Sequence, residues 1–142
     1  DKLFPKVKKF GGYTLNYLSQ DETNEVDSVS GAFMLIPKRV LGKVGLFDES
    51  IFMYGEDIDL CYRIKQAGYK VVYYAGVKMT HLKGQSGLHT KSPVVIKHFH
   101  DGIKRFYDMY YKNKHNFVVT FLMHTAINVR YVMTLAISKI RR

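Results

Sequence analysis

The chain is organised around residues 47–86, which read FDESIFMYGEDIDLCYRIKQAGYKVVYYAGVKMTHLKGQS. Apolar residues recur at helical spacing from Asp57 to Ala67, which predicts a helix that ends at Gly68. The Val- and Tyr-rich run from Tyr69 to Tyr74 predicts a strand. A loop that carries His81 follows this helix–strand unit.

The acidic run Glu56-Asp57-Ile58-Asp59 stands at the start of the predicted helix. Acidic residues suit the positive end of a helix, and Asp59 stands four residues before Arg63, so the two can pair. Alternatively, one carboxylate faces a cleft and acts as a general base. Asp57 and Asp59 formally make a D-x-D metal motif, but side chains two apart on a helix point about 200° apart. The local pattern alone favours the capping role.

Upstream, residues 26–36 (VDSVSGAFMLI) predict a buried strand that Pro37 stops. Within it, Gly31 indicates either a bulge or close approach to a ligand, or a packing glycine. Residues 38–44 predict a short helix that ends at Gly45, and residues 13–18 a short strand.

Charge separates the chain into two parts. Residues 1–88 hold 12 Lys and Arg against 10 Asp and Glu, whereas residues 89–142 hold 10 against 2, giving +2 and +8. Such a basic part favours partners that carry phosphate groups. Nucleic acid is not expected among them, because the sequence contains no known nucleic-acid-binding motif. The single cysteine, Cys61, indicates a reducing compartment.

The basic part predicts two helices. Ser92-Pro93 is a helix start, and an apolar stripe follows at spacings of three and four (Ile96, Phe99, Ile103, Phe106 and Tyr110). Asn116 is the expected cap of a second helix.

Two faces are expected on this last helix. One gathers apolar residues (Val118, Leu122, Val129, Met133, Ala136, Ile140) and the other mostly polar ones (Thr120, His124, Asn128, Tyr131, Thr134, Ser138). It is long enough to span a membrane, but His124, Asn128 and Arg130 argue against this, because an Arg mid-span costs roughly 3 kcal/mol. An interfacial amphipathic helix fits better. The alternative is packing on the body of the protein or on a second subunit, as in a homodimer.

Several short patterns occur together in one order. They are Val26-Asp27-x-Val29-Ser30-Gly31-Ala32-x-Met34-Leu35, Gly45-x-Phe47-Asp48-Glu49, Phe52-x-Tyr54-Gly55-Glu56-Asp57-x-Asp59-Leu60-x-x-Arg63, Gly68-Tyr69-Lys70-Val71-Val72 and His81-x-x-Gly84-x-Ser86. This order resembles bacterial family-2 glycosyltransferases, most closely the rhamnosyltransferase-like members that build cell-surface polysaccharides. Each pattern alone is weak, and the combination is specific.

The resemblance implies an α/β chain: residues 1–90 would be the C-terminal, acceptor-side half of a GT-A nucleotide-diphospho-sugar transferase fold, and residues 91–142 a basic amphipathic helical tail. It further implies an enzyme that inverts the anomeric carbon, with a UDP- or dTDP-sugar donor and a polysaccharide or lipid-linked acceptor. Asp57 matches the general base. Glu56 and Asp59 match acidic positions that bind the acceptor or hold the helix.

The same resemblance assigns His81 to a divalent metal, Mn²⁺ or Mg²⁺, and assigns His81, Gly84 and Ser86 to the donor diphosphate. The nucleotide-binding half of the family is expected before residue 1, so the isolated chain is expected to be inactive. The complete enzyme is expected in the cytoplasm, peripheral at the inner face of the cell membrane. The competing hypothesis is a non-enzymatic module that binds a membrane or a partner through the basic tail.

Overall fold

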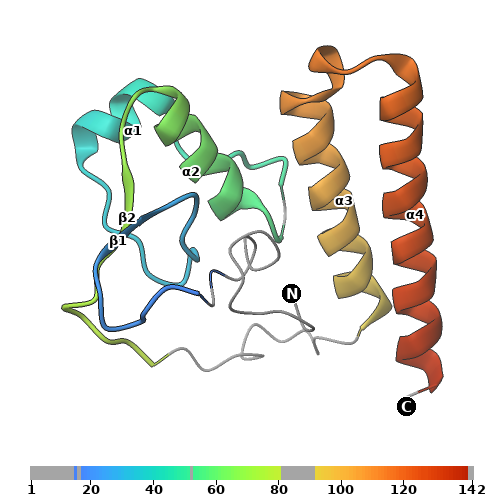
Figure 1. Ribbon diagram of the computed structural model, residues 1–142, viewed down its shortest axis with the longest axis horizontal. Coiled ribbons are helices and arrows are strands. Elements are labelled where there is room, and N and C mark those ends of the chain that lie inside the picture. The colour runs from blue at the N-terminus through green and yellow to red at the C-terminus, as the bar shows by residue number, and fades with distance from the viewer. Residues whose placement is uncertain (1–14, 16, 52, 81–91, 141–142) are drawn as a thin grey trace.

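The computed structural model describes residues 15, 17–51, 53–80 and 92–140. Two strands, β1 (Asn24–Val26) and β2 (Val71–Tyr73), form an antiparallel ladder in which Val26 pairs with Val71. Two helices, α1 (Lys38–Val44) and α2 (Glu56–Gln66), pack beside this ladder. The long helices α3 (Pro93–Tyr110) and α4 (Phe117–Ile140) form a separate hairpin, joined by the 3-10 turn η1 (Lys112–Lys114) (Figure 1).

A small apolar core holds the strands and the first two helices together. Its buried residues are Val26, Val40, Leu60, Cys61, Ile64 and Val71. Among the described apolar residues, Leu60 and Cys61 are the most deeply buried, at 0% and 1% exposure. Full burial of an aliphatic side chain contributes about 1.5–3 kcal/mol, so α2, which supplies half of this core, is its main support.

The predicted helices are confirmed with shifts of a residue or so. Helix α1 ends where expected, at Gly45 with a φ of 83°, and the turn after α2 uses Gly68 with a φ of 85°. These are left-handed conformations that favour glycine. The Asn116 cap is confirmed, because its side-chain oxygen accepts a 3.0 Å hydrogen bond from the amide of Val119. Ser92 precedes α3 as expected, but its side chain makes no capping hydrogen bond.

The predicted strand over residues 26–36 is wrong. Strand β1 ends at Val26, and a turn follows at residues 31–32. At that turn the amide of Gly31 donates to the Asp57 carboxylate instead of to a neighbouring strand. The predicted strand over residues 69–74 is present but shortened to Val71–Tyr73. For the predicted strand over residues 13–18, the described residues Leu15, Tyr17 and Leu18 are not in a strand, and the rest lie outside the described residues.

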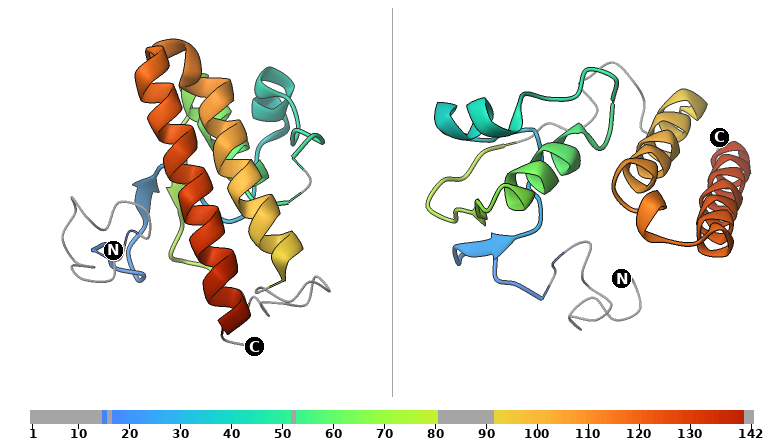
Figure 2. Two further views of the ribbon diagram at one scale, coloured as in Figure 1. Left: turned by 90° about the vertical axis from the view of Figure 1, so that its right-hand side faces the viewer. Right: turned by 90° about the horizontal axis from the view of Figure 1, so that it is seen from above.

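Helix α3 lies between α4 and the rest of the protein, as the two views of Figure 2 show. Its predicted apolar stripe faces the body of the protein: Phe106 packs against Tyr62 with ring centroids 5.3 Å apart, and Phe99 packs against Tyr54 at 6.1 Å. An aromatic layer therefore attaches the hairpin to α2 and to the loop before it. The mixed α/β class with a helical tail is confirmed. The expected division at residues 90–91 falls at the edge of the undescribed range 81–91 and stays a prediction.

Gly102 in α3 lies close against the backbone of the loop before α2. A Cβ at this position would overlap the carbonyl oxygen of Tyr54. We expect Gly102→Ala to lower the free energy of unfolding by about 1–3 kcal/mol, because the backbone cannot yield as a flexible side chain does. Denaturant unfolding followed by circular dichroism measures this.

The matched control is Gly42→Ala in α1, where an added Cβ meets nothing within 4 Å. It should be neutral or stabilising by up to about 1 kcal/mol, since alanine is the better helix former. Equal destabilisation by both substitutions would contradict the close approach at Gly102.

Candidate functional site

Asp57 lies in the first turn of α2 and is half-buried. Its Oδ2 accepts a 2.9 Å hydrogen bond from the amide of Gly31, and its Oδ1 accepts a 2.8 Å bond from the amide of Ile58. A Cβ on Gly31 would lie 3.5 Å from the Cβ of Asp57. Two sequence patterns that stand 26 residues apart therefore meet at this carboxylate. In the described part of the chain no ion pair involves Asp57.

Glu56 is the first residue of α2 and is also half-buried. Its Oε2 is buried without a hydrogen-bond partner among the described residues. A buried carboxylate oxygen that lacks a partner costs roughly 1–3 kcal/mol or more. The cost would be relieved by a hydroxyl group or a water molecule that donates to Oε2.

Asp59 points into the protein, where its side chain is 1% exposed and both of its oxygens have partners. Arg63 donates to Oδ2 from Nε at 2.9 Å and from Nη2 at 2.7 Å. The hydroxyl group of Tyr110, from α3, donates to Oδ1. The predicted Asp59–Arg63 pair is confirmed, and Tyr110 extends it to the hairpin.

Arg63 carries the same network toward the segment after α1. Its guanidinium donates to the carbonyl oxygens of Val44 and Leu46, the latter at 2.8 Å. The pKa of the Tyr110 hydroxyl is raised, mainly by burial and to a lesser extent by the hydrogen bond to Asp59 and the negative charge of Asp59. The hydroxyl therefore stays protonated and remains a donor at neutral pH. Sequence reasoning placed Tyr110 only on an apolar stripe, and no local signal identified its partner.

The described residues do not form a metal site. Asp57 and Asp59 point to different surroundings, as their helical spacing predicts, and no group of three His, Cys, Asp or Glu residues comes together in the described ranges. The predicted ligand His81 and the predicted diphosphate-binding residues Gly84 and Ser86 lie outside the described residues. Burial raises the pKa of the Cys61 thiol, so this residue is not a thiolate ligand or nucleophile at neutral pH.

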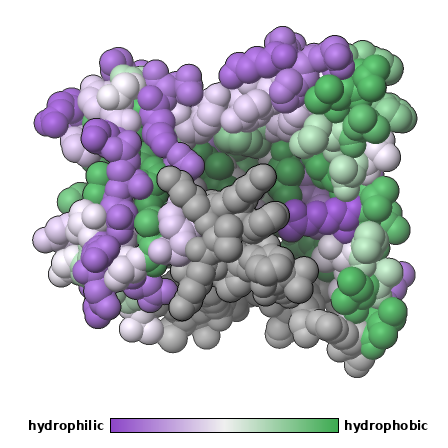
Figure 3. Space-filling view, viewed as in Figure 1, coloured by the Kyte–Doolittle hydropathy of each residue, from purple (hydrophilic) through white to green (hydrophobic). Residues whose placement is uncertain are grey.

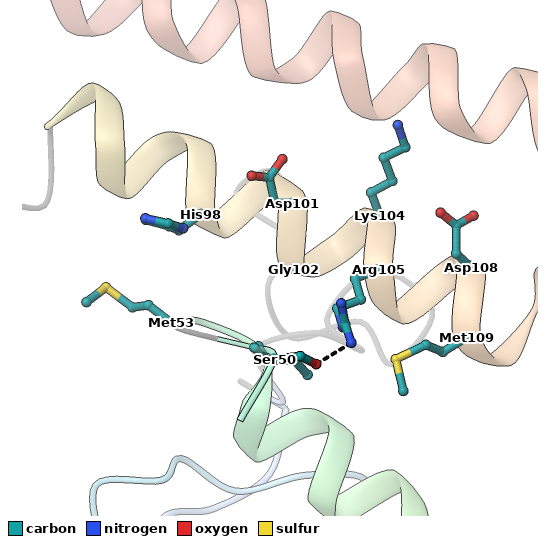
Figure 4. Close-up of a pocket in the computed structure, with 10 residues that line it drawn as sticks. Ser50, Met53, His98, Asp101, Gly102, Lys104, Arg105, Asp108 and Met109 are labelled. Carbon is teal, nitrogen blue, oxygen red and sulfur yellow. Dashed lines mark hydrogen bonds between the residues drawn. The ribbon is translucent and has the colours of Figure 1, made fainter. Parts of the chain in front are cut away.

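A cavity of about 660 Å³ lies between α3 and the loop before α2 (Figure 4). Ser50 and Met53 line it from the loop, and His98, Gly102 and Arg105 line it from α3. The Arg105 guanidinium donates to the hydroxyl oxygen of Ser50, the contact drawn in Figure 4, and lies 3.4 Å from the Asp48 carboxylate.

A second cavity, of about 520 Å³, lies beside β1 and reaches Ser30, next to Gly31. Asp57 lines neither cavity. Sequence reasoning did not anticipate either of them, because each is bounded by segments that are far apart in the chain.

The buried Asp59 network gives a stability prediction. Asp59→Ala should lower the free energy of unfolding by about 3 kcal/mol, because it leaves Arg63 and Tyr110 without their shared partner. Chemical denaturation at neutral pH measures the loss. Asp101→Ala is the control: it removes the exposed ion pair with Lys97 and should change stability by less than about 1 kcal/mol. Similar effects of the two substitutions would rule out a structural role for the network.

Comparison with known proteins gives two kinds of match. Residues 10–97 match the model of the family described as glycosyltransferase-like family 2. Two curated relatives also match: N-acetylglucosaminyl-diphospho-decaprenol L-rhamnosyltransferase of Mycobacterium tuberculosis (strain H37Rv) is 41% identical over 58 residues, and rhamnosyltransferase WbbL of Escherichia coli (strain K12) is 41% identical over 56.

The matched segments cover 41% and 39% of this chain, and 19% and 21% of the two relatives. The chain therefore spans about a fifth of the length of the curated relatives it matches. No solved structure shows a significant match. The family match covers more than half of the chain and includes β1, α1, α2 and β2. The chain belongs to the glycosyltransferase-like family 2.

Proposed function

We propose that the chain is the acceptor side of an inverting glycosyltransferase with a GT-A fold, and that Asp57 is its general base. The observation that carries this proposal is the position of Asp57, which is half-buried at the start of α2 and fixed by the Gly31 amide. Each of its oxygens accepts one backbone hydrogen bond and has a second lone pair available. No described cation pairs with it, so the carboxylate is available to accept a proton.

The reaction is a direct displacement. The Asp57 carboxylate takes the proton of the acceptor hydroxyl while that oxygen bonds to the anomeric carbon of the donor sugar. The bond from this carbon to the nucleoside diphosphate breaks as the new bond forms, which inverts the configuration. General base catalysis of this kind contributes about 10²–10⁴-fold in rate.

The names of the relatives support a choice of substrates. The mycobacterial relative is named for an acceptor that carries a sugar on a lipid diphosphate, and both relatives are named for transfer of rhamnose. We therefore infer a UDP- or dTDP-sugar donor and a lipid-linked or saccharide acceptor for the complete enzyme. That enzyme would act at the cytoplasmic face of the cell membrane, where such acceptors are exposed.

The two carboxylates beside Asp57 take different roles in this proposal. Glu56 binds the acceptor, as the resemblance implies: its Oε2 has no described hydrogen-bond partner, and a sugar hydroxyl that enters beside it can donate to it. Asp59 positions α2 and does not contact the acceptor, because both of its oxygens are bound within the protein.

By resemblance alone, His81 is assigned as a ligand of a divalent metal. His81, Gly84 and Ser86 are assigned, on the same ground, to the donor diphosphate. No step is assigned to the metal. The residues that bind the nucleotide are expected in another part of the complete enzyme, without which the base has no bound donor to act on.

Asp57→Asn in the complete enzyme should lower kcat by about 10²-fold or more, because an amide does not take up the proton. The variant keeps one oxygen that can accept from the Gly31 amide but loses the acceptor for the Ile58 amide, so thermal unfolding should show a loss of only about 1 kcal/mol, too small to unfold the protein. Product formation from a nucleotide sugar in the presence of Mn²⁺ measures the loss. The control, Glu22→Gln, neutralises an exposed carboxylate and should keep full activity. Normal turnover by Asp57→Asn would reject Asp57 as the base.

Glu56→Gln tests acceptor binding. It removes a charged hydrogen-bond acceptor, which is worth about 1.5–3 kcal/mol, so KM for the acceptor should rise about ten- to hundredfold. KM for the nucleotide sugar should not change. Steady-state kinetics with each substrate varied in turn separates the two. A rise in KM for the donor alone would place Glu56 on the donor side and contradict the assignment.

A further inference from the structure

Helix α4 presents an apolar face to the outside of the protein. Besides Phe117 in the first turn, seven large apolar side chains along one side of the helix are 53–84% exposed: Val118, Phe121, Leu122, Val129, Val132, Met133 and Ile140. We call these seven residues the outer face. Figure 3 shows hydrophobic residues along the edge of the molecule where α4 lies, and Figure 2 shows no other element in front of that helix. By length and composition, α4 could cross a membrane.

The opposite side of α4 is polar and packs against α3. The residues of this inner seam recur at spacings of four and three: Thr120, His124, Ile127, Tyr131, Thr134 and Ser138. His124 Nε2 lies 2.8 Å from the Asp108 carboxylate, and the Thr120 hydroxyl lies 3.2 Å from that of Tyr107. A helix on a water-soluble protein normally buries its apolar stripe and exposes its polar one. In α4 this arrangement is reversed.

Two other polar side chains of α4, those of Thr125 and Arg130, are satisfied locally or turned toward α3. The Thr125 hydroxyl donates to the carbonyl oxygen of Phe121 at 2.8 Å. The Arg130 guanidinium lies over the ring of Phe99 in α3, 5.6 Å from its centroid. Of the three residues that argued against a membrane span in the sequence, His124 and Arg130 thus point toward α3, whereas Asn128 is exposed.

We propose that the outer face of α4 lies in the hydrocarbon–headgroup boundary of an anionic bilayer, with the helix axis parallel to the membrane surface. Helix α3 and the body of the protein are then on the aqueous side. This inference rests on the packing of α3 against α4 and is independent of the reaction proposed above.

The parallel orientation follows from α3. Helix α4 is about 36 Å long at 1.5 Å per residue, and α3 packs beside it. If α4 crossed the bilayer, α3 would carry Lys97, Asp101 and Arg105 into the hydrocarbon, each of which costs roughly 3 kcal/mol. If α4 lies flat, these charges stay in water.

Charge favours a lipid surface over a second copy of the chain. Exposed Lys112 and Lys114 precede α4, exposed Lys139 is in its last turn, and Arg141 and Arg142 follow in the sequence. Residues 89–142 carry a net charge of +8. Anionic headgroups attract such a segment by about 1 kcal/mol per basic residue near the surface, whereas two copies face to face repel each other.

The first test is flotation with vesicles that contain phosphatidylglycerol. The chain should float with them, and binding should fall as salt is raised or when phosphatidylcholine alone is used. Leu122→Glu and Val129→Glu should each weaken partitioning into the vesicles at least about tenfold, because each removes an apolar side chain that the bilayer would bury. The control is Leu35→Glu, the same kind of substitution at a residue 92% exposed outside the hairpin, which should bind normally.

Circular dichroism and thermal unfolding establish that each variant is folded. A folded chain that does not bind anionic vesicles overturns the proposal. Sedimentation in the absence of lipid tests the alternative occupant. If the chain dimerises with increasing concentration and Leu122→Glu abolishes the dimer, the proposal is overturned, because the outer face would then be a subunit interface.

The second test is of orientation. Val118→Cys, Thr125→Cys and Val132→Cys place labels seven residues apart along the outward side of α4. With spin labels on vesicle-bound protein, the three depths should be equal and shallow. Cys61 is 1% exposed, and the unsubstituted chain measures its background. A depth that is greatest at residue 125 and falls on both sides would overturn the parallel orientation.

Discussion

The buried carboxylate of Asp59 is the interaction on which the rest of the structure depends. A charge that is removed from water must be paired and fully hydrogen-bonded, and Asp59 meets this requirement with Arg63 of its own helix and Tyr110 of α3. Arg63 fixes the carbonyl groups after α1, and Tyr110 fixes α3. Since Asp59 faces inward, the helical twist directs Asp57, two residues earlier, to the other side of α2. The same helix thus provides one structural carboxylate and the one that is proposed above as the general base.

Helix α3 connects two environments of different character. Its apolar and aromatic stripe packs on Tyr54 and Tyr62 of the body, and its polar side meets the inner seam of α4. Because α3 satisfies the polar groups of α4, α4 is free to expose apolar side chains over its whole length. If the outer face binds a membrane as proposed above, the body of the protein is kept close to that membrane. Tyr110 belongs to both the α3 stripe and the Asp59 network, so it joins the position of the hairpin to that of α2.

The helices could be predicted because their signals are local. Gly45 and Gly68 mark helix ends through a left-handed backbone, and Asn116 caps α4 through an amide three residues away. The strand predicted over residues 26–36 failed for a nonlocal reason. Its apolar composition is typical of a strand, but the Gly31 amide is used by a carboxylate 26 residues later. The two cavities and the contact of Arg105 with Ser50 were missed for the same reason.

The sequence by itself determined the family, the acidic cluster at the start of α2, the Asp59–Arg63 pair and the two faces of α4. Each depends on residue identity at fixed spacing along the chain, which one sequence contains in full. Only the tertiary structure decided which carboxylate is buried, that Glu56 has an oxygen without a described partner, and which face of α4 packs. Amphipathic spacing gives two faces but does not say which one meets the protein. In α4 the choice was made by α3, whose Asp108 and Tyr107 offer hydrogen bonds that an apolar face could not use.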